Sequence, residues 1–255
     1  MQSNYQKFYD LHHQEKPFLL GNVWNVQSAK ANENAGCKAL GTSSAAIAYS
    51  LGYEDGEIIP FEEYFFIIKK IAENTHLPLS VDLESGFSKD IDKLCDKVLQ
   101  LKNIGVVGIN LEDSIVENGE RKLIEKEEFL EKLEAIRSLE AAFFINVRID
   151  TFLLNLPNKM EETKTRISFY QDFCDGIFLP CITDEDEIST ITNFTQLPLN
   201  VMSMPNLPNF ETLKNLGVKR ISSGNFLNDF IYRNLEKQNQ KIIIQQNFNS
   251  IFENA

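Results

Sequence analysis

Short apolar runs alternate along this chain with longer segments whose apolar residues recur at helical spacing. A strand buried on both faces has a continuous apolar run, whereas an amphipathic helix repeats its apolar residues every three or four positions. The segment 60–74, for example, places Phe61, Tyr64 and Ile68 on one helical face. Eight runs have the strand pattern, at 17–24, 39–41, the start of 79–87, 108–111, 143–148, 176–180, 199–202 and 220–224.

Helices are predicted between these strands. Eight strands that alternate with helices favour parallel pairing through right-handed crossovers. A recurring turn supports the count, because a helix end, a glycine and a strand entry follow one another at 34–40, 103–109 and 215–221. The predicted helices are 1–16, 25–34, 60–74, 89–102, 125–139, 160–173, 185–193, 209–216 and most of 225–255.

These elements predict an α/β fold made of a single (β/α)₈ barrel over residues 1–255, with 225–255 as a C-terminal helical tail. No linker rich in Pro, Gly or Ser divides the chain. A doubly wound open sheet is the alternative, but no G-x-G-x-x-G follows the first predicted strand.

Composition narrows the class of protein. A net charge of -12 argues against a nucleic-acid partner and against anionic membrane surfaces. No apolar run approaches the roughly 18 residues of a membrane span, and the polar N-terminus lacks the apolar core of a signal peptide. The four cysteines, Cys37, Cys95, Cys174 and Cys181, have no C-x-x-C spacing. We therefore expect a cytoplasmic protein with reduced thiols.

Acidic residues follow the third predicted strand directly. Asp82 and Glu84 end the apolar run that begins at Leu79, and Asp and Glu are rarely fully buried without a partner. A hard cation such as Mg²⁺ is the simplest partner, although Asp82 could instead cap the next helix. The other strand exits are polar as well, and all exits of such a barrel face one mouth. They contribute Trp24, Asn25, Ser43, Ser44, Glu112, Asp113, Arg148, Asp150, Asn200 and Ser223.

Several of these segments together resemble one family in order along the chain. They are Gly-x-x-Trp at 21–24, Thr-Ser-Ser at 42–44 followed by 51–55, and the stretches 81–87, 108–114, 146–150 and 217–224. The chain is similar in them to the phosphoenolpyruvate mutase/isocitrate lyase superfamily. That resemblance implies a barrel that holds Mg²⁺ beside a small 2-oxo acid and makes or breaks a C–C or P–C bond next to the oxo group.

The resemblance also implies roles for individual residues. Asp82 matches the main metal-ligand position, and Glu84 and Glu112 match acids that hold the metal mostly through water. Asp55 matches a further acid of this group and is a candidate catalytic residue. Candidate substrate-binding residues are Trp24 at the wall of the mouth, Ser43 and Ser44 in a small-residue loop, and Arg148, which would neutralise the substrate's other anionic group and is also a catalytic candidate.

Two departures from the family pattern affect this interpretation. The segment 115–122 contains no cysteine, which argues against an isocitrate or methylisocitrate lyase of the usual kind. Asn118, Arg121 and Lys122 are the groups available there, and Asn118 is the catalytic candidate. The second departure is Glu84, where many members have Asp.

Two classes of function remain open. The first is a Mg²⁺-dependent lyase, decarboxylase or phosphonomutase-type isomerase acting on a 2-oxo acid, dicarboxylic acid or phosphonate. The second is a non-catalytic barrel that binds a carboxylate or phosphate. Apolar residues in 225–255 need to be covered, and the family resemblance implies a last helix exchanged between subunits, so we expect a homodimer or homotetramer. His12, His13 and His76 are expected on the surface.

Overall fold

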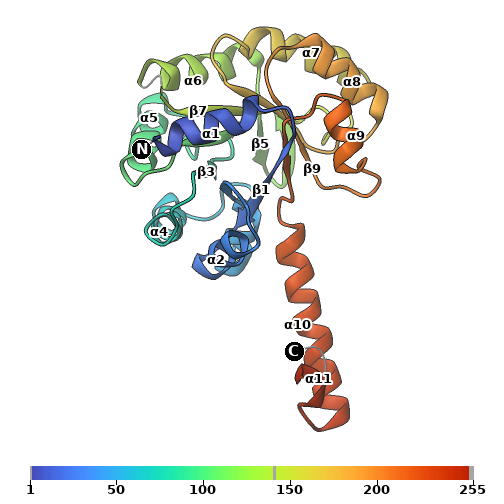
Figure 1. The fold of residues 1–255 in the computed structure, drawn as a ribbon. Helices are drawn as coiled ribbons and strands as arrows, with labels where there is room; N and C mark the ends of the chain where they lie inside the picture. The colour runs from blue at the N-terminus through green and yellow to red at the C-terminus, as the bar shows by residue number, and fades with distance from the viewer. Residues whose placement is uncertain (1, 140–141, 253–255) are drawn as a thin grey trace.

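The computed structural model describes residues 2–139 and 142–252. Eight parallel strands close into a barrel in the order β1-β10-β9-β8-β7-β4-β3-β2, which confirms the predicted (β/α)₈ fold (Figure 1). The barrel strands are β1 Phe18–Val23, β2 Leu40–Thr42, β3 Leu79–Asp82, β4 Gly108–Glu112, β7 Phe144–Arg148, β8 Gly176–Leu179, β9 Leu199–Met202 and β10 Arg220–Ser222.

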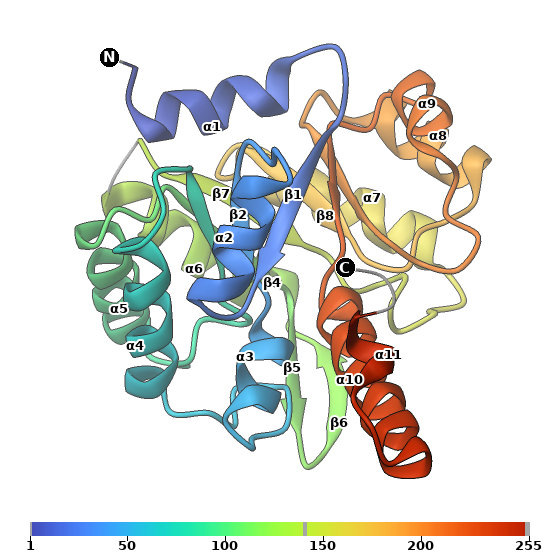
Figure 2. The ribbon, with the colours of Figure 1, turned by 60° about the horizontal axis from the view of Figure 1, so that its bottom comes forward.

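Helices surround the strands and bury their apolar faces against the outside of the barrel (Figure 2). α5, for example, buries Leu94, Val98 and Leu101, which recur at helical spacing. The helices are α1 Asn4–His13, α2 Val26–Asn34, α3 Ser44–Ser50, α4 Phe61–Ala72, α5 Ile91–Asn103, α6 Lys126–Leu139, α7 Lys159–Tyr170, α8 Glu185–Phe194, α9 Phe210–Asn215, α10 Phe226–Gln245 and α11 Asn249–Phe252.

Helix α1 packs beneath the amino ends of the strands. Phe8 and His12 lie one helical turn apart and contact Phe18 and Phe144, the first residues of β1 and β7. The His12 ring stacks on Phe144 with 4.0 Å between ring centroids, and His12 is 1% exposed. The expectation that His12 lies on the surface is therefore wrong. Burial holds the pKa of His12 well below its usual value, so the ring is neutral.

The interior of the barrel is polar at mid-height. Asn146 donates to the side-chain oxygens of Asn110 (2.9 Å) and Asn200 (3.3 Å), and Arg220 donates to Asn110 (3.1 Å). Arg220 is 1% exposed, and burial lowers its pKa to about 9. Such barrels are usually filled by branched apolar residues. Here a hydrogen-bonded layer lies directly beneath the mouth.

Three elements of the structure, two strands and the helix α3, were not predicted. The segment expected as a loop after β4 is an antiparallel hairpin of β5 (Ser114–Glu117) and β6 (Glu120–Leu123). The expected small-residue loop at Ser43 and Ser44 is instead the start of α3, with Ser43 as the N-cap. In the described residues, no helix has the length and apolar character needed to cross a membrane.

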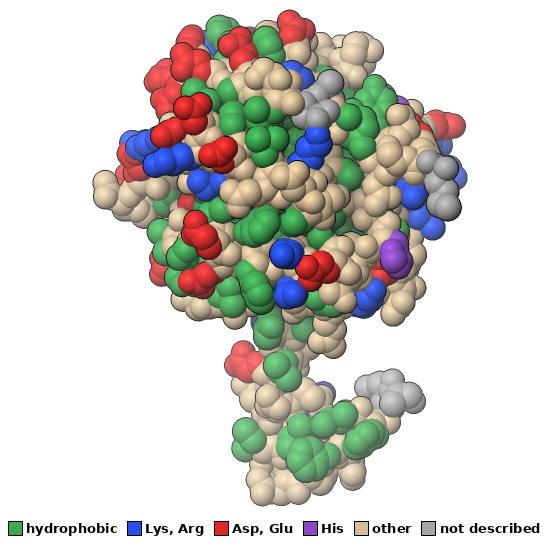
Figure 3. Space-filling model, turned by 90° about the vertical axis from the view of Figure 1, so that its left-hand side faces the viewer, with side chains coloured by type: hydrophobic (Ala, Val, Ile, Leu, Met, Phe, Trp, Pro, Cys, Tyr) green, Lys and Arg blue, Asp and Glu red, His purple; other side chains and the backbone are tan. Residues whose placement is uncertain are grey.

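Helix α10 projects from the barrel, and α11 folds back along it (Figures 1 and 3). Side chains along this segment leave apolar surface in solvent, including Phe230 (59% exposed) and Ile244 (81% exposed). Figure 3 shows apolar side chains gathered toward its far end. The last part of the predicted tail, 253–255, lies outside the described residues.

Candidate active site

A cavity of about 280 Å³ opens at the carboxyl ends of the strands. It gathers residues that are far apart in the sequence, because parallel strands deliver their exits to the same face of the barrel. Five of the residues predicted from the sequence line this mouth cavity, namely Ser43, Ser44, Asp55, Asp82 and Arg148.

Asp82 is held in place from several sides. Its carboxylate accepts hydrogen bonds from Ser44 Oγ at 2.9 Å and Asn110 Nδ2 at 3.4 Å. Its backbone carbonyl accepts from Tyr64 Oη at 2.6 Å, and its N–H donates to Thr42 Oγ1 at 2.9 Å. The last residue of β3 is therefore fixed with its carboxylate toward the mouth.

Glu84 lies two residues further along, in a sharp turn. Its φ of 49° is in the left-handed region, which is uncommon for a residue with a side chain, and Gly86 in the same turn has φ 113°. Glu84 is 2% exposed, and neither carboxylate oxygen has a hydrogen-bond partner among the described residues. Burial, followed by the nearby charge of Glu112, raises its pKa well above the usual range.

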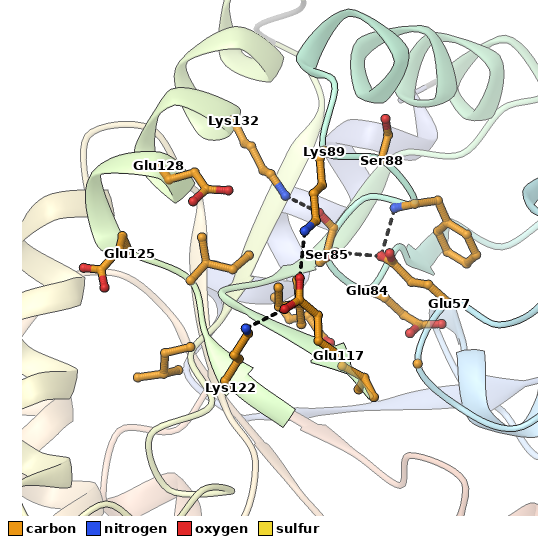
Figure 4. A pocket seen from close by; sticks show the side chains of 17 residues that line it. Glu57, Glu84, Ser85, Ser88, Lys89, Glu117, Lys122, Glu125, Glu128 and Lys132 are labelled. Atoms are coloured by element: carbon orange, nitrogen blue, oxygen red, sulfur yellow. Dashed lines mark hydrogen bonds and ion pairs between the residues drawn. The ribbon is translucent and has the colours of Figure 1, made fainter. Parts of the chain in front are cut away.

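Glu84 and Glu112 line a second cavity of about 440 Å³, which lies beneath the β5–β6 hairpin (Figure 4). Lys132 of α6 reaches into it and donates to the Ser85 carbonyl at 3.0 Å. The two predicted metal-linked glutamates thus border this neighbouring cavity, whereas Asp55 and Asp82 line the mouth cavity.

Glu112 takes part in a group of alternating charges that spans three strands. Arg148 Nη1 lies 2.8 Å from Glu112, and its Nε and Nη2 contact both oxygens of Asp150 at 2.7 and 3.1 Å. Arg121 of β6 pairs with the same two carboxylates, Glu112 and Asp150. Arg148 is therefore paired with two carboxylates, and Arg121 is an additional cation at the mouth.

Asp55 lies in the loop after α3. One of its carboxylate oxygens, Oδ1, is buried without a hydrogen-bond partner among the described residues. Burial and the neighbouring Asp82 charge raise its pKa. Like Glu84, it is an acid whose ionised form lacks sufficient positive charge nearby.

Two predicted residues lie elsewhere. Trp24 is buried and lines a separate cavity of about 390 Å³ between α2 and the base of α10, together with Leu227 and Ile231. Asn118 occupies the turn of the hairpin with φ 53°, next to Gly119. Neither residue lines the mouth cavity or the cavity beneath the hairpin.

The acids of the mouth and of the neighbouring cavity fit a hydrated divalent cation better than a directly ligated one. Within the part of the chain that the structure describes, no three His, Cys, Asp or Glu side chains are placed to ligate one metal ion. Mg²⁺ usually keeps several waters and takes one or two carboxylates directly. The unpartnered oxygens of Asp55 and Glu84, and their raised pKa values, are what a nearby cation would relieve.

A family model described as phosphoenolpyruvate phosphomutase matches residues 8–243, which is most of the chain. The chain belongs to the phosphoenolpyruvate phosphomutase family. This membership confirms the resemblance seen in the sequence motifs. Family and relatives together indicate an enzyme of the phosphoenolpyruvate mutase and isocitrate lyase type.

Three relatives of this phosphomutase-family chain illustrate the similarity. An uncharacterized protein of Mycobacterium tuberculosis is 36% identical over 218 residues, covering 85% of this chain and 81% of the relative. The crystal structure of a putative phosphonomutase from Burkholderia cenocepacia has TM-score 0.87 at 30% identity, covering 92% of this chain and 98% of that one. A phosphonopyruvate hydrolase in complex with oxalate and Mg²⁺ shares the fold, with TM-score 0.84, 20% identity, and 98% and 90% of the two chains covered.

Proposed function

We propose that this protein is a Mg²⁺-dependent enzyme that makes or breaks a C–C or P–C bond beside the oxo group of a small 2-oxo acid. The observation that carries this proposal is the mouth cavity of about 280 Å³, which Asp55, Asp82 and Arg148 line together. Acids for a cation and an arginine for an anion are the complement of a metal-bound oxo acid.

The residues of the mouth cavity and of the neighbouring cavity beneath the hairpin would have different roles. Asp82, fixed by Ser44 and Asn110, would hold the metal directly, and Asp55, Glu84 and Glu112 would hold its waters. A Mg²⁺ ion held by these residues would supply positive charge beside the oxo group, where negative charge develops when the neighbouring bond breaks. Ser43 and Ser44 are placed to bind the oxo-acid carboxylate, since both line the cavity beside Asp82.

The substrate class follows from the charges. A cavity of this size holds a compound of a few carbon atoms that carries anionic groups, such as a 2-oxo dicarboxylic acid or a phosphonate. The phosphonopyruvate hydrolase that shares this fold binds oxalate with Mg²⁺, which supports the use of oxalate as a probe here. Trp24 and Asn118 have no part in this proposal, because they lie outside the mouth cavity.

The test is turnover by the purified protein across a panel of 2-oxo acids and phosphonates, with pyruvate release measured in the presence and absence of Mg²⁺. We expect turnover of at least one compound with Mg²⁺, and its loss in Asp82→Ala. Asp96→Ala is the matched control, because Asp96 is an exposed residue of α5. Absence of turnover across the panel, with ligand binding retained in Asp82→Ala, would instead support a non-catalytic barrel that binds a carboxylate or phosphate.

We also propose that the tail formed by 225–255 exchanges between subunits, in a homodimer or homotetramer. Exposed apolar side chains along α10 and α11 support this proposal, since a helix that leaves its own barrel with such a surface requires a partner to cover it. The partner proposed is a second copy of this chain.

A further inference from the structure

Arg121 occupies a position at the mouth that depends on the hairpin. Along β6 the side chains alternate between exposed and partly buried, with Glu120 and Lys122 exposed and Arg121 and Leu123 turned inward. This alternation carries Arg121 over the end of the barrel, where it lines the mouth cavity. Its side chain is 17% exposed, close to the 15% of Arg148.

The two arginines differ in which nitrogen atoms are occupied. Every nitrogen of the Arg148 guanidinium contacts a carboxylate, with Nε and Nη2 on Asp150 and Nη1 on Glu112. In Arg121 only Nη1 contacts protein among the described residues. It donates to Ser114 Oγ at 2.7 Å and to Asp150 Oδ2 at 3.3 Å, and it also pairs with Glu112. Its Nε and Nη2 therefore remain available to a ligand.

The free atoms of Arg121 form a binding edge. Nε–H and Nη2–H project in parallel from one side of a guanidinium, and this is the edge with which Arg148 grips Asp150. A carboxylate or phosphonate bound there would receive two charge-assisted hydrogen bonds. Nη1, held by Glu112, Ser114 and Asp150, restricts the orientation of that edge, so little side-chain freedom is lost on binding.

We propose that Arg121 binds the second anionic group of the substrate, the one that is not the oxo-acid carboxylate, and so determines specificity for 2-oxo acids that carry a carboxylate or phosphonate on the adjacent carbon. This inference rests on the proposed function. Asp55 and Asp82 face the same cavity and repel an anion. Arg148 is already paired with two carboxylates, so it attracts a further anion less strongly. The free guanidinium edge of Arg121, on the β4–β7 side of the mouth, supplies this attraction.

The experiment compares two probes by isothermal titration calorimetry with Mg²⁺ present. Oxalate represents the oxo-acid end alone, and 3,3-difluorooxaloacetate adds the second carboxylate. Arg121→Gln removes the charge and the binding edge. Lys122→Gln is the matched control, because Lys122 lies on the opposite face of β6 and pairs with Glu117.

We expect Arg121→Gln to weaken binding of the longer probe by roughly tenfold to a hundredfold, the effect of losing a charge-assisted pair, and to change oxalate binding by less than about threefold. Lys122→Gln should change neither. Arg121→Lys keeps the charge without the two parallel donors, so it should weaken binding of the longer probe by an intermediate factor. It should also keep the fold if the glutamine variant does not.

Other outcomes overturn the inference. Equal weakening of both probes in the Arg121 variants would show that Arg121 only maintains the shape of the mouth. Unchanged binding of the longer probe would show that Arg121 does not contact the second anion, while leaving the proposed function intact. Failure of the wild-type protein to bind either probe would refute the proposed function and this inference together.

Discussion

Replacing Arg166 should destabilise the protein far more than replacing a surface lysine on the same helix. Arg166 of α7 is 5% exposed, and its Nη1 lies 3.0 Å from Asp113, which is completely buried. The same nitrogen donates to the Ile124 carbonyl and to Tyr170. Removing the cation leaves Asp113 as an uncompensated buried charge, which costs about 3–5 kcal/mol. Arg166→Met keeps most of the side-chain volume, so the loss reflects the removed charge and its hydrogen bonds rather than a cavity.

Urea unfolding at fixed protein concentration measures the effect. We expect Arg166→Met to lower the free energy of unfolding by about 3–5 kcal/mol. Lys164→Met, which removes a pair with the exposed Glu161 and a contact of the ammonium with the Phe194 ring, should change it by less than about 1 kcal/mol. Adding Asp113→Asn to Arg166→Met should recover part of the loss, because Asn keeps an acceptor for the Asp150 N–H, which donates to Asp113 Oδ1.

The loss of unfolding free energy caused by Arg166→Met should also depend on pH. Burial, only partly offset by Arg166, raises the pKa of Asp113 to about 7, and removal of Arg166 raises it further. An acid whose folded pKa is raised loses stability as pH rises from its unfolded pKa toward the folded one, because the native state then binds more protons. The cost of Arg166→Met should therefore be larger at about pH 8 than at about pH 5. A loss below about 1 kcal/mol at both pH values, or no recovery in the double variant, would refute the reasoning.

Three further predictions concern the C-terminal tail, the buried imidazole of His12 and the buried thiol of Cys174. Phe230→Asp combined with Leu235→Asp should reduce the wild-type oligomer to a monomer in light scattering, and a monomeric wild type would contradict the exchange of α10. His12 is buried with a lowered pKa, so the protein should become less stable as pH falls below about 6.5, because only the unfolded state then binds the extra proton. Melting curves of His12→Leu should therefore depend less on acid pH than those of the wild type. The Cys174 thiol, whose pKa is raised by burial, should not react with a thiol reagent until the protein unfolds, and rapid labelling of native protein would contradict this.

The alternation of apolar runs and helical segments was sufficient to predict the barrel, because most positions of the barrel strands are buried on both faces, whereas helices such as α5 are buried on one. The placement of Asp82 was predictable for the same reason, since it directly ends such a run. Ser44 was also placed correctly at the mouth, although the start of α3 was interpreted as a loop.

The errors arose where the direction of a side chain decides its role. Trp24 follows β1, but its ring packs toward α10 rather than into the mouth. Arg121 was not assigned a role because its place at the mouth depends on the register of the hairpin. One sequence signal could have revealed that hairpin: Asn118-Gly119 is a favoured two-residue turn, and both residues have positive φ, 53° and 79°.

The hydrogen-bonded layer inside the barrel links the thermal stability of this protein to the geometry of its proposed reaction centre. Asn110 contacts Arg220 on one side and Asp82 on the other, so a single amide links the centre of the fold to the proposed metal position. In most barrels an engineer can gain heat resistance by packing the centre more tightly with hydrocarbon. Here an apolar residue in place of Asn110 would remove a hydrogen bond that positions Asp82, so greater heat resistance would come with a less ordered reaction centre.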